Sequence, residues 1–197
     1  MSEDEKTPEM TEEVRRNYEE MRRFLGDEIE RRWAADTPER AWIKYMAGVA
    51  VGTGYSMAKL AMEKYGDEAK ELLAQALHDA GYEHGKRARA RVEARGGDID
   101  DMRELHAEYR QDYAEHYDLY QVEVLKNRWA MRLPVCHMAT ALKEWHAKVP
   151  ECKDPHYWCD YDFGFIEAYN PKVKLSRPHW LVAGDPYCEY IWELPEE

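Results

Sequence analysis

The hydrophobic periodicity of the chain changes at Tyr117, and this change constrains the fold more than any other feature of the sequence. Before Tyr117, apolar residues recur at the three- and four-residue spacing that is typical of helices. After it, apolar and polar residues alternate up to Leu125, and apolar residues recur at every second position from Trp129 to Leu133, which favours strands. Helices gathered first and strands later predict an α+β fold: a helical N-terminal half followed by an antiparallel sheet, not a doubly wound sheet.

Four helices are expected before Tyr117. Thr7-Pro8-Glu9 and Asp36-Thr37-Pro38-Glu39 combine a capping residue, a first-turn proline and an acid, which are helix start signals. The first helix should reach about Ala35, and the second should end at Tyr65-Gly66. The third is expected from Asp67 towards Ala94, and the fourth from Ile99 to about Tyr113.

The second helix contains Gly48, Gly52 and Gly54 between apolar residues, so we expect a buried helix with close neighbours. These glycines do not form a phosphate loop, because the apolar period runs through them and no Lys-Ser/Thr follows. The fourth helix is mostly charged and is expected on the surface. The one basic cluster is interpreted as a solvated helix face and comprises Lys86, Arg87, Arg89, Arg91 and Arg95.

The second half should combine the sheet with two short helices, over 136–147 and 157–169, because Asn170-Pro171 cannot easily continue the latter. Beyond the hairpin that ends at Leu133, strands are expected at 173–175, 180–183 and 187–194, the last two joined by a turn at Gly184-Asp185-Pro186. We expect a helical extension over residues 1–36 and a single α+β domain over 37–197, a length suited to one well-packed core.

The charge balance excludes some partners. Forty acidic residues against twenty-eight basic ones give a net charge of −12, which repels nucleic-acid phosphates and anionic lipids. No apolar run approaches the roughly 18–20 residues that cross a bilayer, and Met1 to Lys6 is acidic with no apolar core behind it. We therefore expect a cytoplasmic protein with no nucleic-acid or membrane partner and with four reduced cysteines. A homo-oligomer stays open.

The C-terminal third concentrates the residues that carry chemistry, because it holds all four cysteines and half of the eight histidines. Cys136-His137 stands at a predicted helix start, where the helix dipole favours a thiolate. Taken singly, each cysteine is equally well explained as a small buried hydrophobe. Cys152-x6-Cys159 and Cys188 do not match zinc-finger spacing, so no cofactor is expected, although zinc ligands distant in sequence stay open.

Four blocks in this region occur in a characteristic order: Pro134-x-Cys136-His137, Tyr157-Trp158-Cys159-Asp160-x-Asp162, Tyr169-Asn170-Pro171 and Gly184-Asp185-Pro186-Tyr187-Cys188-x-Tyr190. Together, and with Arg177 between the last two, they resemble the C-terminal signature of the L-2-amino-thiazoline-4-carboxylic acid hydrolase family. The resemblance is best over residues 134–192, and the helical part from Trp42 agrees in layout.

The resemblance implies a hydrolase that opens a small cyclic amidine or isothiourea by attack at the carbon between nitrogen and sulfur. Such a reaction needs an activated nucleophile, a proton donor and a cation for the substrate carboxylate. The resemblance implies Cys159, Asp160, Cys136 and His137 as catalytic residues. For substrate binding it implies Arg177 as the carboxylate clamp, together with Asn170, Tyr161 and Cys188.

A wider likeness, to small-molecule-binding domains of the vinyl-reductase type, implies a second class of function. That class is a non-catalytic binding or sensor module, whose pocket needs no perturbed titratable group. Asn170 is also a plain helix stop, and Cys188 is also a plain strand residue, so both interpretations stay open from the sequence.

Overall fold

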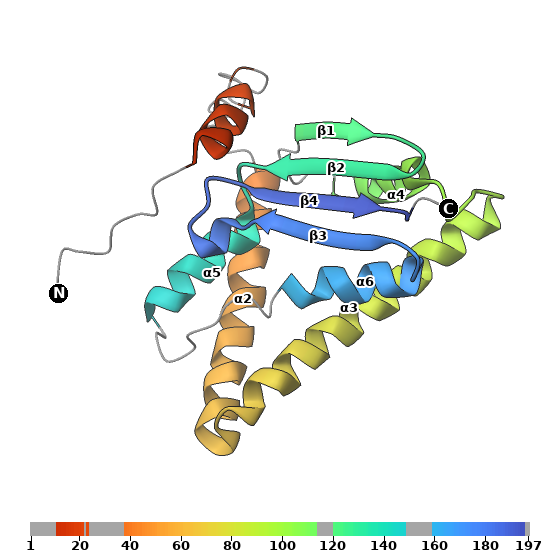
Figure 1. Ribbon diagram of the computed structural model, residues 1–197. Helices are drawn as coiled ribbons and strands as arrows, with labels where there is room; N and C mark the ends of the chain where they lie inside the picture. The colour runs from red at the N-terminus through yellow and green to blue at the C-terminus, as the bar shows by residue number, and fades with distance from the viewer. Residues whose placement is uncertain (1–10, 22, 24–37, 114–119, 149–158, 196–197) are drawn as a thin grey trace.

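The computed structural model describes residues 11–21, 23, 38–113, 120–148 and 159–195. Residues 12–21 form an N-terminal helix. The elements that follow are α2 (Pro38–Tyr65), α3 (Glu68–Ala94), α4 (Met102–Tyr113), β1 (Tyr120–Val124), β2 (Arg128–Leu133), α5 (His137–Lys148), α6 (Asp160–Tyr169), β3 (Lys174–His179), the 3₁₀ turn η2 (Leu181–Ala183) and β4 (Cys188–Glu193). Figure 1 shows this order, with α2, α3 and α4 before the first strand and with α5 and α6 between β2 and β3, and it confirms the predicted α+β class.

The four strands form one antiparallel sheet in the order β1-β2-β4-β3. The predicted hairpin of β1 and β2 is confirmed. The strand predicted at 180–183 is wrong, because Leu181–Ala183 form η2 and only Trp180, which precedes it, is extended. The reason is local: Gly184 adopts φ 103°, and the Asp185 carboxylate accepts the N–H of Trp180 at 2.7 Å, which closes a turn where an extended strand was expected.

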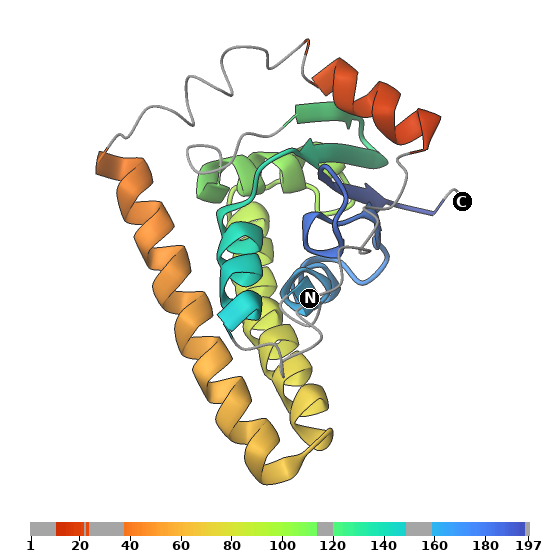
Figure 2. The same ribbon diagram turned by 90° about the vertical axis from the view of Figure 1, so that its left-hand side faces the viewer.

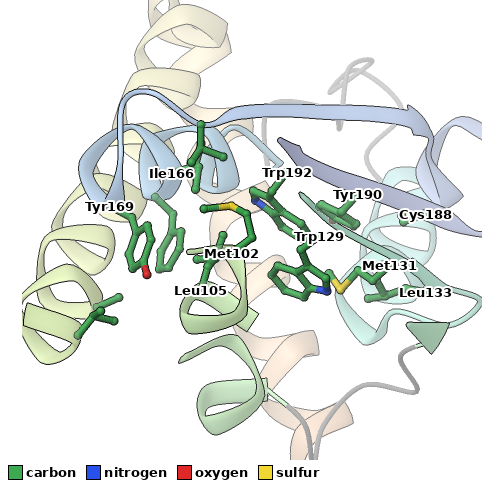
Figure 3. Close-up of a cluster of buried hydrophobic side chains, with 14 residues drawn as sticks. Met102, Leu105, Trp129, Met131, Leu133, Ile166, Tyr169, Cys188, Tyr190 and Trp192 are labelled. Carbon is green, nitrogen blue, oxygen red and sulfur yellow. The ribbon is translucent and has the colours of Figure 1, made fainter. Parts of the chain in front are cut away.

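One face of the sheet packs on α3, α4 and α6 and forms the main core (Figure 3). The pleat places Trp129 and Met131 of β2 and Tyr190 and Trp192 of β4 on this face, since alternate strand residues share a side. The rings of Trp129 and Trp192 stack with centroids 4.0 Å apart. None of the helices in the described ranges combines the length and apolar character needed to cross a membrane.

Helix α4 contributes to this core, so its predicted surface position is wrong in part. Met102 and Leu105 are fully buried, and Glu108 exposes 1% of its surface. Glu108 accepts hydrogen bonds from Arg91, at 2.8 Å, and from Arg95. Two members of the predicted basic helix face therefore bind a buried carboxylate, which offsets the cost of removing that charge from water.

Helix α2 is only half-buried, and the expectation of a buried helix is wrong for its outer face. Val51, Tyr55 and Ala58 pack against α5 in a second core, whereas Trp42 and Leu60 expose 62% and 66% of their surface. Figure 2 shows α2 at the periphery, with the rest of the helices on one side of it.

The N-terminal helix lies against the residue that precedes β4. Val14 and Met21 bury the ring of Tyr187, and the Asn17 amide donates to the Tyr187 hydroxyl at 3.2 Å. Most of the predicted extension over residues 1–36 lies outside the described residues, so its separation as a domain stays a prediction.

Helices α3 and α6 approach closely because glycines stand at the contact. A Cβ added at Gly81 would lie 1.9 Å from the Tyr161 carbonyl oxygen, and one added at Gly85 would lie 2.1 Å from the Phe165 carbonyl oxygen. In the other direction, a Cβ at Gly164 would lie 2.0 Å from the His78 carbonyl oxygen. No side chain fits at these positions unless the helix backbones separate.

Gly81→Ala is therefore expected to lower the free energy of unfolding by about 1–3 kcal/mol, the usual cost of overpacking a core. Gly48→Ala is the matched control, since a Cβ at Gly48 meets no atom within 4 Å. Removing a glycine from an exposed helix interior should raise the free energy of unfolding by about 0.5–1 kcal/mol. Urea titration measures the free energy of unfolding of both variants. Equal changes in Gly81→Ala and Gly48→Ala would contradict the close contact between α3 and α6.

Candidate functional site

Three cysteines from separate elements meet at one end of α6. Cys136 directly precedes α5, Cys159 is the N-cap residue of α6, and Cys188 begins β4. Each is a free thiol, while Cys152 lies outside the described residues. They lie close enough for charges on Cys136 and Cys159 to raise the pKa of Cys188. The structure thus brings together the cysteines of three of the four sequence blocks.

Arg177 lies on the core side of β3 beside these thiols. Its side chain exposes 1% of its surface, and its Nη1 donates to the Asp162 carboxylate at 3.1 Å. Its Cζ atom is 4.6 Å from the ring centroid of Phe163 and 4.7 Å from that of Trp180. Aromatic faces of this kind stabilise a cation that has little contact with water.

Two nitrogens of Arg177, Nε and Nη2, are buried and have no hydrogen-bond partner among the described residues. The Tyr190 hydroxyl and the Cys159 thiol lie close enough to the guanidinium to act on its pKa through hydrogen bonding as well as charge, but neither meets full hydrogen-bond geometry at Nε or Nη2. A buried guanidinium normally uses its donors, because each unpaired polar group carries a desolvation cost. These two donors are therefore the candidate position for an anionic group.

Asp162 is the charged partner at the same point. Burial raises its pKa, while Arg177 and a hydrogen bond with Tyr190 act in the opposite direction. Its side chain exposes 23% of its surface, while burial of the carboxylate is the largest influence on its pKa. A carboxyl group whose pKa is raised by burial holds a proton more readily than a free one, and it can both accept and return a proton during a reaction.

The thiols of the site are protonated at neutral pH. Burial raises the pKa of Cys159 to about 12, helped by Asp162 and opposed by Arg177. Burial also raises the pKa of Cys136, although its sulfur accepts the N–H of Ala139 at 3.5 Å at the start of α5. The helix terminus was expected to favour a thiolate at Cys136, and the larger effect of burial reverses that expectation.

The other predicted site residues lie around or away from this cluster. His137 is buried at the start of α5, and Asp160 is near enough to raise the pKa of Asp162. The Tyr161 hydroxyl is 2.6 Å from His84 Nδ1, on the side of α6 that faces α3.

Asn170 lies at the far end of α6. Its amide donates to the Ile99 carbonyl at 3.0 Å and to Asp100 at 2.7 Å, and so ties α6 to the α3–α4 connection. The ten residues of α6 separate it from Cys159 by roughly 15 Å along the helix axis.

Sequence reasoning did not place Asp162 and Tyr190 in the site, although both stand in its motif blocks. Asp162 follows Cys159 by three positions, which puts both on one helix face, whereas Asp160 diverges by about 100°. Tyr190 follows Cys188 by two positions, which puts both on one strand face. Helix and strand spacing shows which residues share a face with each cysteine, but it does not show which face is directed to Arg177.

No group of three or more His, Cys, Asp or Glu side chains is arranged to hold a metal ion in the ranges that the structure describes. Zinc binding, which the sequence left open, therefore has no donor group to support it there.

A helical first half, an antiparallel sheet and a buried arginine among three thiols define an α+β protein with a candidate anion site. The chain belongs to the L-2-amino-thiazoline-4-carboxylic acid hydrolase family, whose model matches residues 49–192. Among solved structures, the phenol-responsive sensory domain of the transcription activator PoxR with phenol is similar, with 14% identity and a TM-score of 0.49. The similarity covers 73% of this chain and 73% of that one. No curated protein matches the chain.

Proposed function

We propose that the chain hydrolyses a small cyclic isothiourea or amidine that carries a carboxylate. The observation that supports this most directly is the buried Arg177 with two unpartnered nitrogens. A guanidinium binds a carboxylate through two parallel N–H groups, so Nε and Nη2 form a ready clamp. Membership of the aminothiazoline-carboxylate hydrolase family supports the substrate class.

In the proposed reaction, water adds to the carbon between nitrogen and sulfur. The carbon–oxygen bond forms and the carbon–sulfur bond breaks. One proton of the water ends on the leaving sulfur and the other on the former ring nitrogen, giving an N-carbamoyl-cysteine type product. Asp162 takes the proton from water and returns it to the sulfur. Asp162 also balances the positive charge that an isothiourea acquires on protonation, while Arg177 holds the carboxylate.

In this scheme the thiols do not act as nucleophiles. Because the pKa of Cys159 is about 12, its thiolate is scarce at neutral pH, and water is the better nucleophile. We propose that Cys159, Cys136 and Cys188 line the space around the substrate sulfur. Asp160 helps by raising the pKa of Asp162. We also propose His137, the residue that follows Cys136 at the start of α5, as a second acid–base group.

The direct test is incubation of the folded chain with L-2-amino-thiazoline-4-carboxylic acid, followed by mass spectrometry for a product heavier by one water. 2-Aminothiazoline, which lacks the carboxylate, is the matched control substrate. We expect turnover of the first and at least about 10²-fold lower kcat/KM for the second, since a lost charged contact to a buried arginine removes a few kcal/mol. Absence of turnover with folded protein contradicts the proposal.

The second candidate function is a binding or sensor module without catalysis. The specific observation in its favour is the protonated state of all three described thiols, together with the aromatic enclosure of Arg177. Calorimetry distinguishes the two functions: saturable binding of the carboxylate without product formation supports the sensor, and binding with product formation supports the hydrolase.

A further inference from the structure

Helix α2 carries a second apolar face that no described element covers. We call it the outer stripe, and its members are Trp42, Tyr45, Met46, Val49, Met57 and Leu60. At about 100° per residue these six positions fall within an arc of about 120°. Each exposes 44–66% of its surface. The face that packs against α5 lies on the opposite side of the same helix.

A helix that is apolar on both faces is typical of the interior of a protein, not of its edge. Figure 2 shows that α2 is nonetheless an edge element, with its outer side directed away from the other helices. In the stretch from Tyr45 to Ala58, no Asp, Glu, Lys, Arg or His occurs, although 35% of the chain is charged. This part of the molecule therefore lacks the charges that keep a surface monomeric.

The outer stripe is also hollowed. A groove of about 650 Å³ runs along it and is bounded on one side by Trp145 of α5. The Trp145 ring lies directly over Gly52, where a Cβ would be 2.4 Å away, and Gly48 has open space around it. The groove can thus accept large side chains from a facing helix, and the small residues beside it permit a close approach.

The size of the stripe fits a dimer interface. Its six side chains together expose on the order of 600 Å² per copy, at the upper end of the apolar patches found on monomers and near the ~800 Å² that each partner buries in a standard interface. The pocket rim and the flanking residues of α2 would supply the remainder.

We propose that two copies of the chain associate through the outer stripes of their α2 helices, paired antiparallel about a two-fold axis. In that arrangement Val49 faces Thr53 of the second copy near the axis, and the large residues at one end meet those at the other, Trp42 against Leu60. The stripe is then complementary to itself, as a two-fold interface requires. Its lack of charge matters here, because two copies of a chain with net charge −12 repel each other elsewhere.

The test is sedimentation equilibrium of the full chain across about 1–100 µM, the range over which mass action separates a micromolar dimer from a monomer. We expect a dimer. Val49→Glu should raise its Kd by about 10²-fold or more, because like charges then meet near the axis. Val122→Glu is the matched control: Val122 is also a valine, with 41% exposure against 44% for Val49, but it lies on β1. It should leave the Kd unchanged.

Two further measurements keep the test decisive if Val49→Glu folds poorly by circular dichroism. Met57→Glu, at a position exposed by 62%, should weaken the dimer to a similar degree. Mixing Val49→Glu with Val49→Lys should restore association, which a general loss of fold does not allow. Three results would overturn the proposal. The chain could be monomeric at all concentrations, or it could form a dimer whose Kd neither stripe variant changes. The stripe could also bind neutral phospholipid vesicles in place of a second copy.

Discussion

Asp162→Asn is expected to hydrolyse L-2-amino-thiazoline-4-carboxylic acid about 10²- to 10⁴-fold more slowly than the unchanged chain, the scale of one lost acid–base group. Asparagine keeps the shape of the side chain and can still accept from Arg177, but it cannot take a proton from water. The loss should therefore appear in kcat, with KM changed little, because the carboxylate clamp on Arg177 remains. Steady-state kinetics at saturating substrate measure this directly.

Asp160→Asn is the control for this experiment, since it removes an adjacent carboxylate that diverges from Cys159 around the helix. We expect less than about a tenfold effect there, because Asp160 acts through the pKa of Asp162. Its effect should shift the acid limb of the pH–rate profile to lower pH, as removal of a neighbouring negative charge lowers the pKa of Asp162. Equal losses in the two variants would show that Asp162 has no special role.

Arg177→Met is expected to lower the free energy of unfolding by about 3–5 kcal/mol, because the substitution leaves Asp162 without its partner in a buried setting. This loss in the free energy of unfolding should depend on pH. Without Arg177 the folded-state pKa of Asp162 rises further above its unfolded value, so the folded state binds more protons and the variant gains relative stability as pH falls towards 4. Urea titrations at several pH values measure this trend.

The double variant Arg177→Met/Asp162→Asn isolates the interaction. It should be more stable than Arg177→Met alone, because the unpaired charge is gone, and the coupling should exceed about 1 kcal/mol. Arg89→Met is the matched control for loss of an arginine, since Arg89 pairs with Glu93 at 2.7 Å on an exposed helix face. Its effect should stay below about 1 kcal/mol. If Arg177→Met costs no more than Arg89→Met, the ion pair with Asp162 is not the buried contact described above.

Local patterns were sufficient to predict most of the elements. These patterns act within a few residues, so their effect is visible in the sequence. They include the change of hydrophobic period at Tyr117, Gly66 with its φ of 62°, and the proline after Asn170. The strand predicted at 180–183 failed because a side chain five residues away, Asp185, captures the Trp180 N–H. Alternation alone does not reveal such a competing hydrogen bond.

The site was predictable only to the level of its blocks. Cysteines from three blocks do meet, because the sheet order brings β4 between β2 and β3. The choice of carboxylate depended on which side of α6 faces β3, and that direction is set by the glycine contact with α3. The helix dipole at Cys136 was visible in the sequence, but the burial that outweighs it was not, since burial depends on elements distant along the chain.

The glycine contact between α3 and α6 also has a mechanical consequence. Because backbone lies directly on backbone at Gly81, Gly85 and Gly164, neither helix can roll or slide against the other without lifting off entirely. We therefore expect the two helices to move as one rigid unit, with Cys159 and Asp162 at the N-terminal end of α6. Adjustment to ligands of different size is then expected from the opposite side of the site, which comprises the η2 turn and the ends of β3 and β4 around Arg177.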